Sequence, residues 1–193
     1  MFNYFLNQAK NIVISNNTSE ILKNSKSLSF HKNLKVYNSS PLISLMSLAK
    51  ELKINNLFVK DESERFGLNA FKVLGASYAI NHLLNNESNI TTFCTATDGN
   101  HGRAVAWAAR NENKKCVVYV PKNTTKLRMD AIVNEGAKVY KLEMNYEKTC
   151  DYAKKMSLEN NWTLIQDTSW DNYEVIPALI MSGYLTHFHE LEN

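Results

Sequence analysis

Cysteine is scarce in this chain of 193 residues, which contains only Cys94, Cys116 and Cys150. The three are far apart, odd in number and form no C-x-x-C pair, so neither a disulfide framework nor a metal site is expected. Cys94 and Cys116 lie in apolar runs, where a thiol usually behaves as a small core residue. Both are therefore predicted to be unreactive.

Long apolar runs and blocks of like charge are also missing. No segment approaches the roughly 18 consecutive apolar residues of a membrane span. Residues 1–6 (MFNYFL) lack the basic region of a signal peptide, which leaves the cytoplasm as the expected location. The net charge of +3 is small and dispersed, so neither a nucleic acid nor an acidic membrane is expected as a partner.

Proline and glycine are few, with three and six copies, and no obvious linker interrupts the chain. The length suits one domain, or one and a part, and is sufficient for a sizeable core. A G-x-G-x-x-G cluster, which commonly binds phosphate groups, does not occur. The glycines stand singly, at positions 67, 75, 99, 102, 136 and 183.

Strand-like and helical patterns alternate from residue 57 onward. This alternation predicts an α/β fold with an open, mostly parallel sheet and flanking helices. The predicted strands are short apolar or β-branched runs, at 57–59, 91–96, 116–121, 139–142 and 162–166.

The pattern before residue 57 is weaker. Residues 31–40 are predicted to be a connecting segment, and Pro41 is predicted to stand in the first turn of a helix that extends to about Leu52. The run 57–59 is predicted to be a buried strand because all three of its side chains are apolar.

Lys72 lies where an irregular turn, marked by Gly67 and Asn69, changes to a helical pattern. Phe71 and Val73 flank it. Desolvation near a helix N-terminus would lower the pKa of the lysine amine and make it a nucleophile. For a single lysine, a solvated side chain in the first turn of a surface helix is the favoured explanation, so the residue alone does not establish a nucleophile.

Two further polar segments follow predicted strands. Residues 97–103 (TDGNHGR) open a helix, where Gly99 and Gly102 would let a ligand such as an amino-acid carboxylate approach the backbone N–H groups. Asp167 follows the strand at 162–166, on the side of the sheet where ligands bind. An ordinary helix cap remains an alternative explanation for each segment.

Several segments together resemble the fold-type II pyridoxal-phosphate enzymes, and within that family the diaminopropionate ammonia-lyases. The most specific features are the long RFGLNAFK form around Lys72 and the aspartate at position 98, where many relatives carry serine. The resemblance runs from about Asn33 to the C-terminus and covers only the N-terminal portion of the family pattern. The matching segments are 60–75 (KDESERFGLNAFKVLG), 95–103 (TATDGNHGR), 144–146 (MNY) and 166–173 (QDTSWDNY).

The resemblance implies a role for each of these polar residues. Lys72 would bind pyridoxal 5'-phosphate covalently and act as a catalytic base, and Asp98 would be a second catalytic base on the opposite face. Asn100 would bond the ring oxygen of the cofactor. The residues implied to bind the substrate are Asp98, Gly99, Asn100, His101, Gly102 and Asp167.

The implied reaction is β-elimination of ammonia from 2,3-diaminopropionate, which gives pyruvate and ammonia. A serine/threonine dehydratase-like enzyme of the same fold is the alternative. A non-catalytic truncated remnant is a third possibility, because the glycine-rich phosphate loop of the family and the residue beneath the pyridine nitrogen are both missing.

The resemblance also implies an organisation. Residues 1–85 would form the N-terminal part of the large cofactor domain, and residues 86–193 the small α/β domain and a following helix, with the remainder of the large domain absent. The strand at 57–59 would then lack neighbours and leave a sheet edge and apolar surface exposed. The expected partners are a small amino-acid substrate and either a second copy, giving a homodimer of the complete enzyme, or a complementary C-terminal chain.

Overall fold

The computed structural model describes residues 15–191, so the N-terminal residues that argue against a signal peptide lie outside the described part of the chain. None of the described helices is long and apolar enough to cross a membrane. The elements, in chain order, are α1 (Asn16–Lys23), α2 (Ser27–Lys32), β1 (Leu42–Ser44), α3 (Met46–Leu52), β2 (Phe58–Lys60), the 3-10 turn η1 (Arg65–Gly67), α4 (Lys72–Asn86), β3 (Thr92–Ala96), α5 (Asn100–Asn111), β4 (Lys115–Val120), α6 (Lys126–Asn134), β5 (Lys138–Lys141), α7 (Tyr146–Glu159), β6 (Thr163–Leu164) and α8 (Val175–His189).

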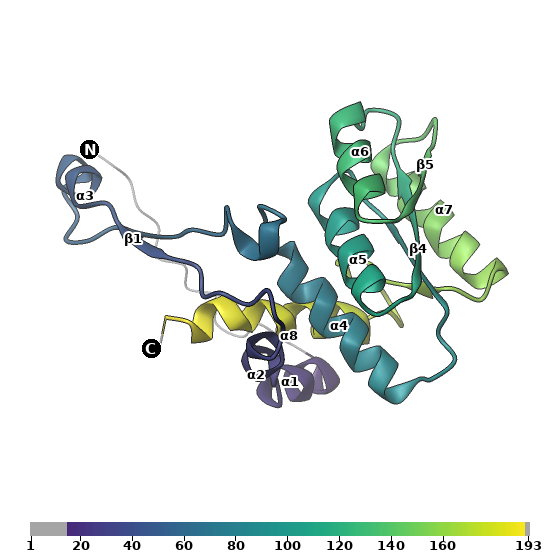
Figure 1. Cartoon of the computed structure of the whole chain (residues 1–193), viewed down its shortest axis with the longest axis horizontal. Helices are drawn as coiled ribbons and strands as arrows, with labels where there is room; N and C mark the ends of the chain where they lie inside the picture. Colours follow the sequence, from purple (N-terminus) through teal and green to yellow (C-terminus); the bar gives the residue numbers. More distant parts are fainter. Residues whose placement is uncertain (1–14, 192–193) are drawn as a thin grey trace.

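The central sheet has four strands in the order β5-β4-β3-β6, all parallel. Helices α5 and α6 lie on one face and α7 on the other (Figure 1). Every residue of β3 is buried, as expected for a strand covered on both faces. Phe93 and Val118 pack toward α5, whereas Cys94 and Val117 pack toward α7. The predicted open parallel α/β sheet is confirmed.

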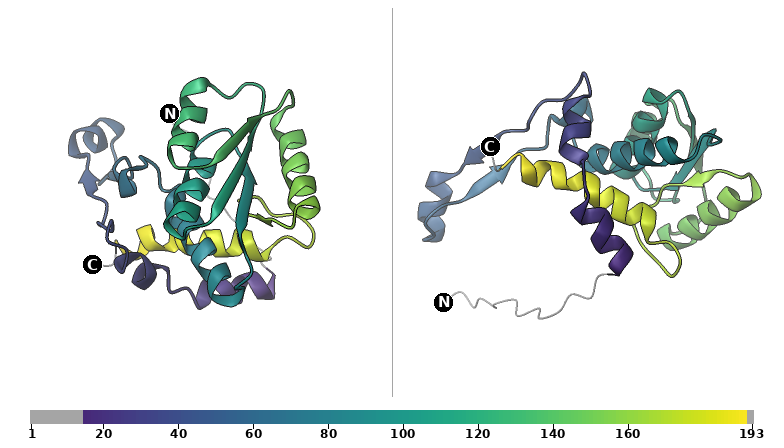
Figure 2. Two further views of the ribbon diagram at one scale, coloured as in Figure 1. Left: turned by 45° about the vertical axis from the view of Figure 1, so that its right-hand side comes forward. Right: turned by 90° about the horizontal axis from the view of Figure 1, so that it is seen from below.

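Helix α8 returns to the start of the chain and packs along α4, with α1 and α2 on its other side (Figure 2). A Cβ on Gly183 would collide with the Leu74 carbonyl, so glycine permits the close crossing of α8 and α4. His31 of α2 joins both helices: its Nδ1 lies 2.6 Å from Thr186 Oγ1, and its Nε2 lies 3.1 Å from Leu74 O. Burial lowers the pKa of His31 to about 4, so the ring is neutral at pH 7.

Residues 42–60 form an arm that extends away from the sheet (Figure 1). Strand β1 pairs antiparallel with β2, with Leu42 opposite Lys60 and Ser44 opposite Phe58, and α3 connects them. The apolar side chains of this arm are largely exposed to solvent: Leu42, Ile43, Met46, Leu48, Leu52, Ile54, Phe58 and Val59. The expected exposed apolar surface is therefore present, but the expectation that the strand lacks neighbours was wrong, because β1 pairs with β2.

The prediction of a buried strand at 57–59 was wrong, because Phe58 and Val59 are 53% and 42% exposed on the unpacked arm. The prediction of a helix from Pro41 was wrong at its start, because residues 42–44 are extended. Pro41 O accepts the Asp61 amide at 2.9 Å, so pairing with β2 holds the chain extended until α3 begins. The predicted connecting segment also contains the end of α2, whose buried residues are polar and give little apolar signal.

Candidate active site

A cavity of about 320 Å³ lies at the carboxyl end of β3, where parallel α/β sheets bind ligands. The first turns of α4, α5, α6 and α7 surround it together with the segment after β6. Its lining residues are Lys72, Thr97, Asp98, Gly99, Asn100, His101, Arg128, Tyr146 and Asp167. The structure therefore brings together segments that are up to 95 residues apart in the sequence.

Lys72 is the first residue of α4, as predicted from the change in pattern. Its Nζ donates a hydrogen bond of 2.8 Å to Asp167 Oδ2 and lies 5.4 Å and 5.6 Å from the ring centres of Phe71 and Tyr184. The side chain is 30% exposed. One carboxylate and two aromatic rings thus hold the ammonium group at the cavity wall, still open to a ligand.

Asp167 stands between Lys72 and His101. Burial acts to raise the pKa of Asp167, but the nearby His101 ring and the hydrogen bond from Lys72 outweigh it and keep that pKa below its usual range. The His101 ring is buried, and its Nε2 lies 2.9 Å from Ile165 O, which makes Nε2 the protonated nitrogen. Burial lowers the pKa of His101, and its Nδ1 faces Asp167 Oδ2 at 3.7 Å. The hydrogen bond of the His101 ring therefore joins the start of α5 to the segment after β6.

The loop between β3 and α5 is shaped by Thr97. Its Oγ1 accepts the amides of Gly99 at 3.0 Å and of Gly102 at 3.1 Å. The first amides of a helix have no partners within the helix, so those of Asn100 and His101 are left to face a ligand. Gly102 itself does not line the cavity, and a Cβ there would collide with Thr97 Cγ2. Its close contact with Thr97 shows that this glycine is required for packing.

Three lining residues were not predicted as site residues: Thr97, Arg128 and Tyr146. Arg128 Nη1 donates to Asp98 O at 3.3 Å from the first turn of α6. The Tyr146 hydroxyl accepts a 3.2 Å hydrogen bond from Gln166 Nε2, and burial raises the pKa of this tyrosine, so it stays protonated. Arg128 and Tyr146 each lie in the first turn of a helix that follows a parallel strand. Because ligands bind at this end of such a sheet, that placement could have identified both residues from the sequence.

Gln166 does not line the cavity but bonds residues next to it. Its Oε1 accepts hydrogen bonds from Thr95 Oγ1 and from the backbone N–H of Ala96, both at 3.1 Å. The backbone N–H of Gln166 donates to Tyr173 Oη at 2.8 Å. The same side chain therefore joins the ends of β3 and β6 and bonds Tyr146. Asp167, the next residue, is positioned by this junction.

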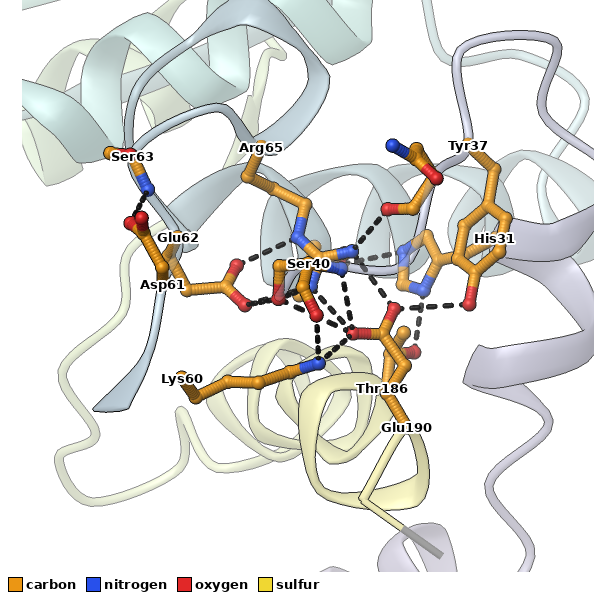
Figure 3. Close-up of polar contacts among 12 residues, drawn as sticks. His31, Tyr37, Ser40, Lys60, Asp61, Glu62, Ser63, Arg65, Thr186 and Glu190 are labelled. Carbon is orange, nitrogen blue, oxygen red and sulfur yellow. Dashed lines mark hydrogen bonds and ion pairs between the residues drawn. The ribbon is translucent and has the colours of Figure 1, made fainter. Parts of the chain in front are cut away.

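Arg65, seven residues before Lys72, is the centre of a second charged group (Figure 3). Its guanidinium is completely buried and bonds the Glu62 carboxylate at 2.7 Å and the Glu190 carboxylate at 2.8 and 2.9 Å. We call this group the Arg65 cluster; its members are Tyr37, Ser40, Lys60, Glu62, Arg65 and Glu190.

The Arg65 cluster partly confirms the predicted ion pair. Arg65 was expected to bond Asp61 or Glu62, and it bonds Glu62, whereas Asp61 accepts the Ser63 amide at 2.9 Å. Burial acts to raise the pKa of Glu190, but hydrogen bonds from Arg65 and Lys60 overcome it and lower that pKa to about 2. The cluster thus ties the segment before Lys72 to the C-terminal end of α8.

The chain is similar to diaminopropionate ammonia-lyases. It is 38% identical over 206 residues to the enzyme of Escherichia coli K12, a match that covers 96% of this chain and 52% of the relative. The Salmonella typhimurium enzyme is 41% identical over 180 residues, covering 82% and 45% of the two chains. A crystal structure of the E. coli enzyme in complex with D-serine matches with a TM-score of 0.84 and 37% identity, covering 92% of this chain and 49% of that one.

The chain therefore spans about half the length of the curated relatives it matches. A family model described as "Pyridoxal-phosphate dependent enzyme" matches residues 34–192, which agrees with the extent of the resemblance seen in the sequence. The chain belongs to the family of pyridoxal-phosphate dependent enzymes.

Proposed function

We propose that this chain supplies the cofactor lysine and the catalytic bases of a diaminopropionate ammonia-lyase. The complete enzyme would remove the β-amino group of 2,3-diaminopropionate as ammonia, and the product would hydrolyse to pyruvate and a second ammonia. The observation that carries the proposal is the placement of Lys72, Asp98 and Asp167 around one cavity. Two carboxylates beside a reactive amine suit a small substrate that carries two amino groups.

The residues present fit the aldehyde end and the ring of pyridoxal 5'-phosphate. Lys72 would hold the aldehyde carbon, since its Nζ reaches the cavity from a helix terminus. Asn100 would bond the ring oxygen. When bound, the cofactor supplies an electron sink for the substrate α-carbon. Its phosphate needs several convergent N–H donors, and we propose that they come from the part of the family fold that this chain does not span.

The protons are handled by Lys72 and Asp98. Lys72 would remove the α-proton of one enantiomer and Asp98 that of the other, from the opposite face of the substrate. Asp167 would keep the Lys72 amine oriented through the 2.8 Å hydrogen bond. The amides of Asn100 and His101 would bind the substrate carboxylate, with Gly99 and Gly102 shaping the loop.

A dehydratase of the same family that acts on serine or threonine is the second candidate. Its leaving group is a hydroxyl, which carries no positive charge for a second carboxylate to attract. The exposed Asp98 carboxylate, which has no hydrogen-bond or ion-pair partner among residues 15–191, favours a substrate with a cationic β-amino group instead. A non-catalytic remnant would leave such a group without a use.

The exposed arm of β1, α3 and β2 supports a proposal about assembly. Two antiparallel strands are marginally stable alone, and the arm leaves eight large apolar side chains at least 40% exposed. We propose that it packs against strands of the complementary half of the family fold, and that the complete enzyme is a cytoplasmic homodimer. The division into residues 1–85 and 86–193 belongs to the same proposal, with α8 grouped with the first part because it packs on α4.

The test is to produce this chain together with the part of the E. coli enzyme that it does not match, add pyridoxal 5'-phosphate and measure pyruvate. We expect release from D- and L-2,3-diaminopropionate to exceed release from serine, and the Lys72→Ala variant to give none. This chain alone is expected to bind the cofactor weakly and to be inactive. Faster release from serine than from either diaminopropionate isomer would favour the dehydratase, and no release from any of them would contradict both candidates.

A further inference from the structure

Arg103 belongs to the TDGNHGR motif, but the proposed mechanism gives it no part. It lies near the start of α5, and its guanidinium reaches back to the turn that precedes Lys72. Nη1 donates to Leu68 O at 3.0 Å, and Nη2 donates to Gly67 O at 3.4 Å. Nε bonds Glu135 Oε1 at 3.2 Å, which holds the guanidinium from the other side.

The turn that Arg103 contacts has no strand or helix of its own beyond the short η1. Phe66, Gly67 and Asn69 have positive φ values of 50°, 72° and 60°, conformations that the surrounding contacts must maintain. The Arg65 cluster fixes the beginning of this turn, and α4 starts at its end. Arg103 connects the middle of the turn to α5 by hydrogen bonds, and the stacked rings of Phe66 and Trp107, with centres 5.8 Å apart, add an apolar contact between the same two elements.

We propose that Arg103 is a positioning residue that holds Lys72 in register with the Asp98–His101 loop. Arg103 and that loop share the first turn of one helix, so a bond from Arg103 to the Lys72 turn fixes the two halves of the cavity relative to each other. Displacing a reacting group by about 1 Å can cost about 100-fold in rate. The catalytic consequence of this inference rests on the proposed function; the structural link does not.

Arg110 provides a matched control on the same helix. It also bonds Glu135, with Nη2 2.9 Å from Oε2, and it donates to Asn134 O at 3.2 Å. It contacts neither Gly67 nor Leu68. Arg103→Ala and Arg110→Ala therefore each remove one arginine from α5 and one ion pair from Glu135, but only the first frees the turn before Lys72.

The experiment compares Arg103→Ala, Arg103→Lys and Arg110→Ala in the full chain by amide hydrogen exchange. The reporters are the amides of Gly67 and Leu68, which donate to Glu64 O at 3.2 Å and to Arg65 O at 2.9 Å. We expect about tenfold faster exchange in Arg103→Ala, an intermediate change in Arg103→Lys, and less than about twofold in Arg110→Ala. Should Arg103→Ala fail to fold, Arg103→Lys decides, because it keeps the charge but cannot span both carbonyls and Glu135.

The second measurement uses the complemented enzyme. It is the rate at which pyridoxal phosphate and borohydride label Lys72, mapped by peptide mass and compared with the labelling of the other lysines. We expect Arg103→Ala to lower labelling of Lys72 about tenfold or more, and Arg110→Ala to leave it unchanged. Equal effects of the two alanine variants, or faster exchange without a change in labelling, would overturn the positioning role. If Lys72 of the unmodified chain carries no label even in the complemented enzyme, the proposed function fails instead, and hydrogen exchange alone decides whether Arg103 holds the turn.

Discussion

The segment from Lys60 to Lys72 contributes residues to two charged groups, the Arg65 cluster and the cavity, which differ in how many of their polar atoms are hydrogen-bonded within the protein. In the Arg65 cluster, the guanidinium is completely buried and all three of its nitrogens are bonded within the protein. In the cavity, Lys72 is 30% exposed with one carboxylate partner, and the Asp98 side chain has none among residues 15–191. A charged group whose hydrogen-bonding atoms all have partners within the protein stabilises the fold, whereas a group with unused donors or acceptors can bind a ligand.

The largest effect is expected for Lys72→Ala in the complemented enzyme. Loss of a covalent catalytic group costs about 10³-fold to 10⁶-fold in turnover, and we expect pyruvate release to fall by that much. Stability should change little, because the Lys72 side chain is partly exposed. Pyruvate release and denaturant unfolding measure the two effects, and unaltered turnover would remove Lys72 from the mechanism.

Asp98→Asn should produce the next largest effect, and an asymmetric one. We expect turnover of D-2,3-diaminopropionate to fall by about 10²-fold to 10⁴-fold, as for a lost general base, and turnover of the L-isomer to fall less. Steady-state rates for the two isomers provide the measurement. Equal losses would mean that Asp98 binds the substrate without moving its proton.

Substitution in the Arg65 cluster should instead lower stability. Arg65→Met leaves the Glu62 and Glu190 carboxylates without their main partner, and we expect the free energy of unfolding to fall by about 3–5 kcal/mol. The control is Lys126→Ala, which breaks an ion pair with Asp130 whose side chains are 85% and 51% exposed, and should cost about 0.5 kcal/mol or less. Similar losses for the two variants would show that the buried cluster contributes no more than a surface pair.

The same comparison explains which parts of the site could be read from the sequence. Lys72, Asp98 and Asp167 each follow a local change of pattern at the end of a strand or the start of a helix, which makes them candidates, and the resemblance to fold-type II enzymes implies their roles. Glu190 is 125 residues from Arg65, and no periodicity links the two. Such contacts depend on how α8 returns across α4, which local sequence does not encode.

The fold, too, was predictable where it depends on local sequence patterns and not where it depends on contacts between distant segments. The alternating strands and helices after residue 90 were predictable because parallel strands buried on both faces are continuously apolar. The exposed position of the arm was not predictable. An apolar strand normally indicates burial, but no residue of β2 is buried. Among the described residues, eight large apolar side chains of the arm stay at least 40% exposed.

The smallest predicted effect is the pH dependence that Glu190 contributes. The pKa of Glu190 is lowered to about 2 from an ordinary value of 4.5, so the unfolded chain binds its proton more readily than the folded one. This stabilisation is complete above about pH 4.5 and is lost as the pH falls toward 2. Denaturant unfolding of Glu190→Gln should show a shallower loss of stability across that range, and an unchanged slope would contradict the assignment.

The most direct test of the account is the identity of the lysine that reacts with the cofactor. The complemented enzyme is mixed with pyridoxal 5'-phosphate, reduced with borohydride, digested and mapped by peptide mass. We predict a pyridoxyl label on Lys72 and on no other lysine of this chain. A label on another lysine, with Lys72 unmodified, would contradict the central claim.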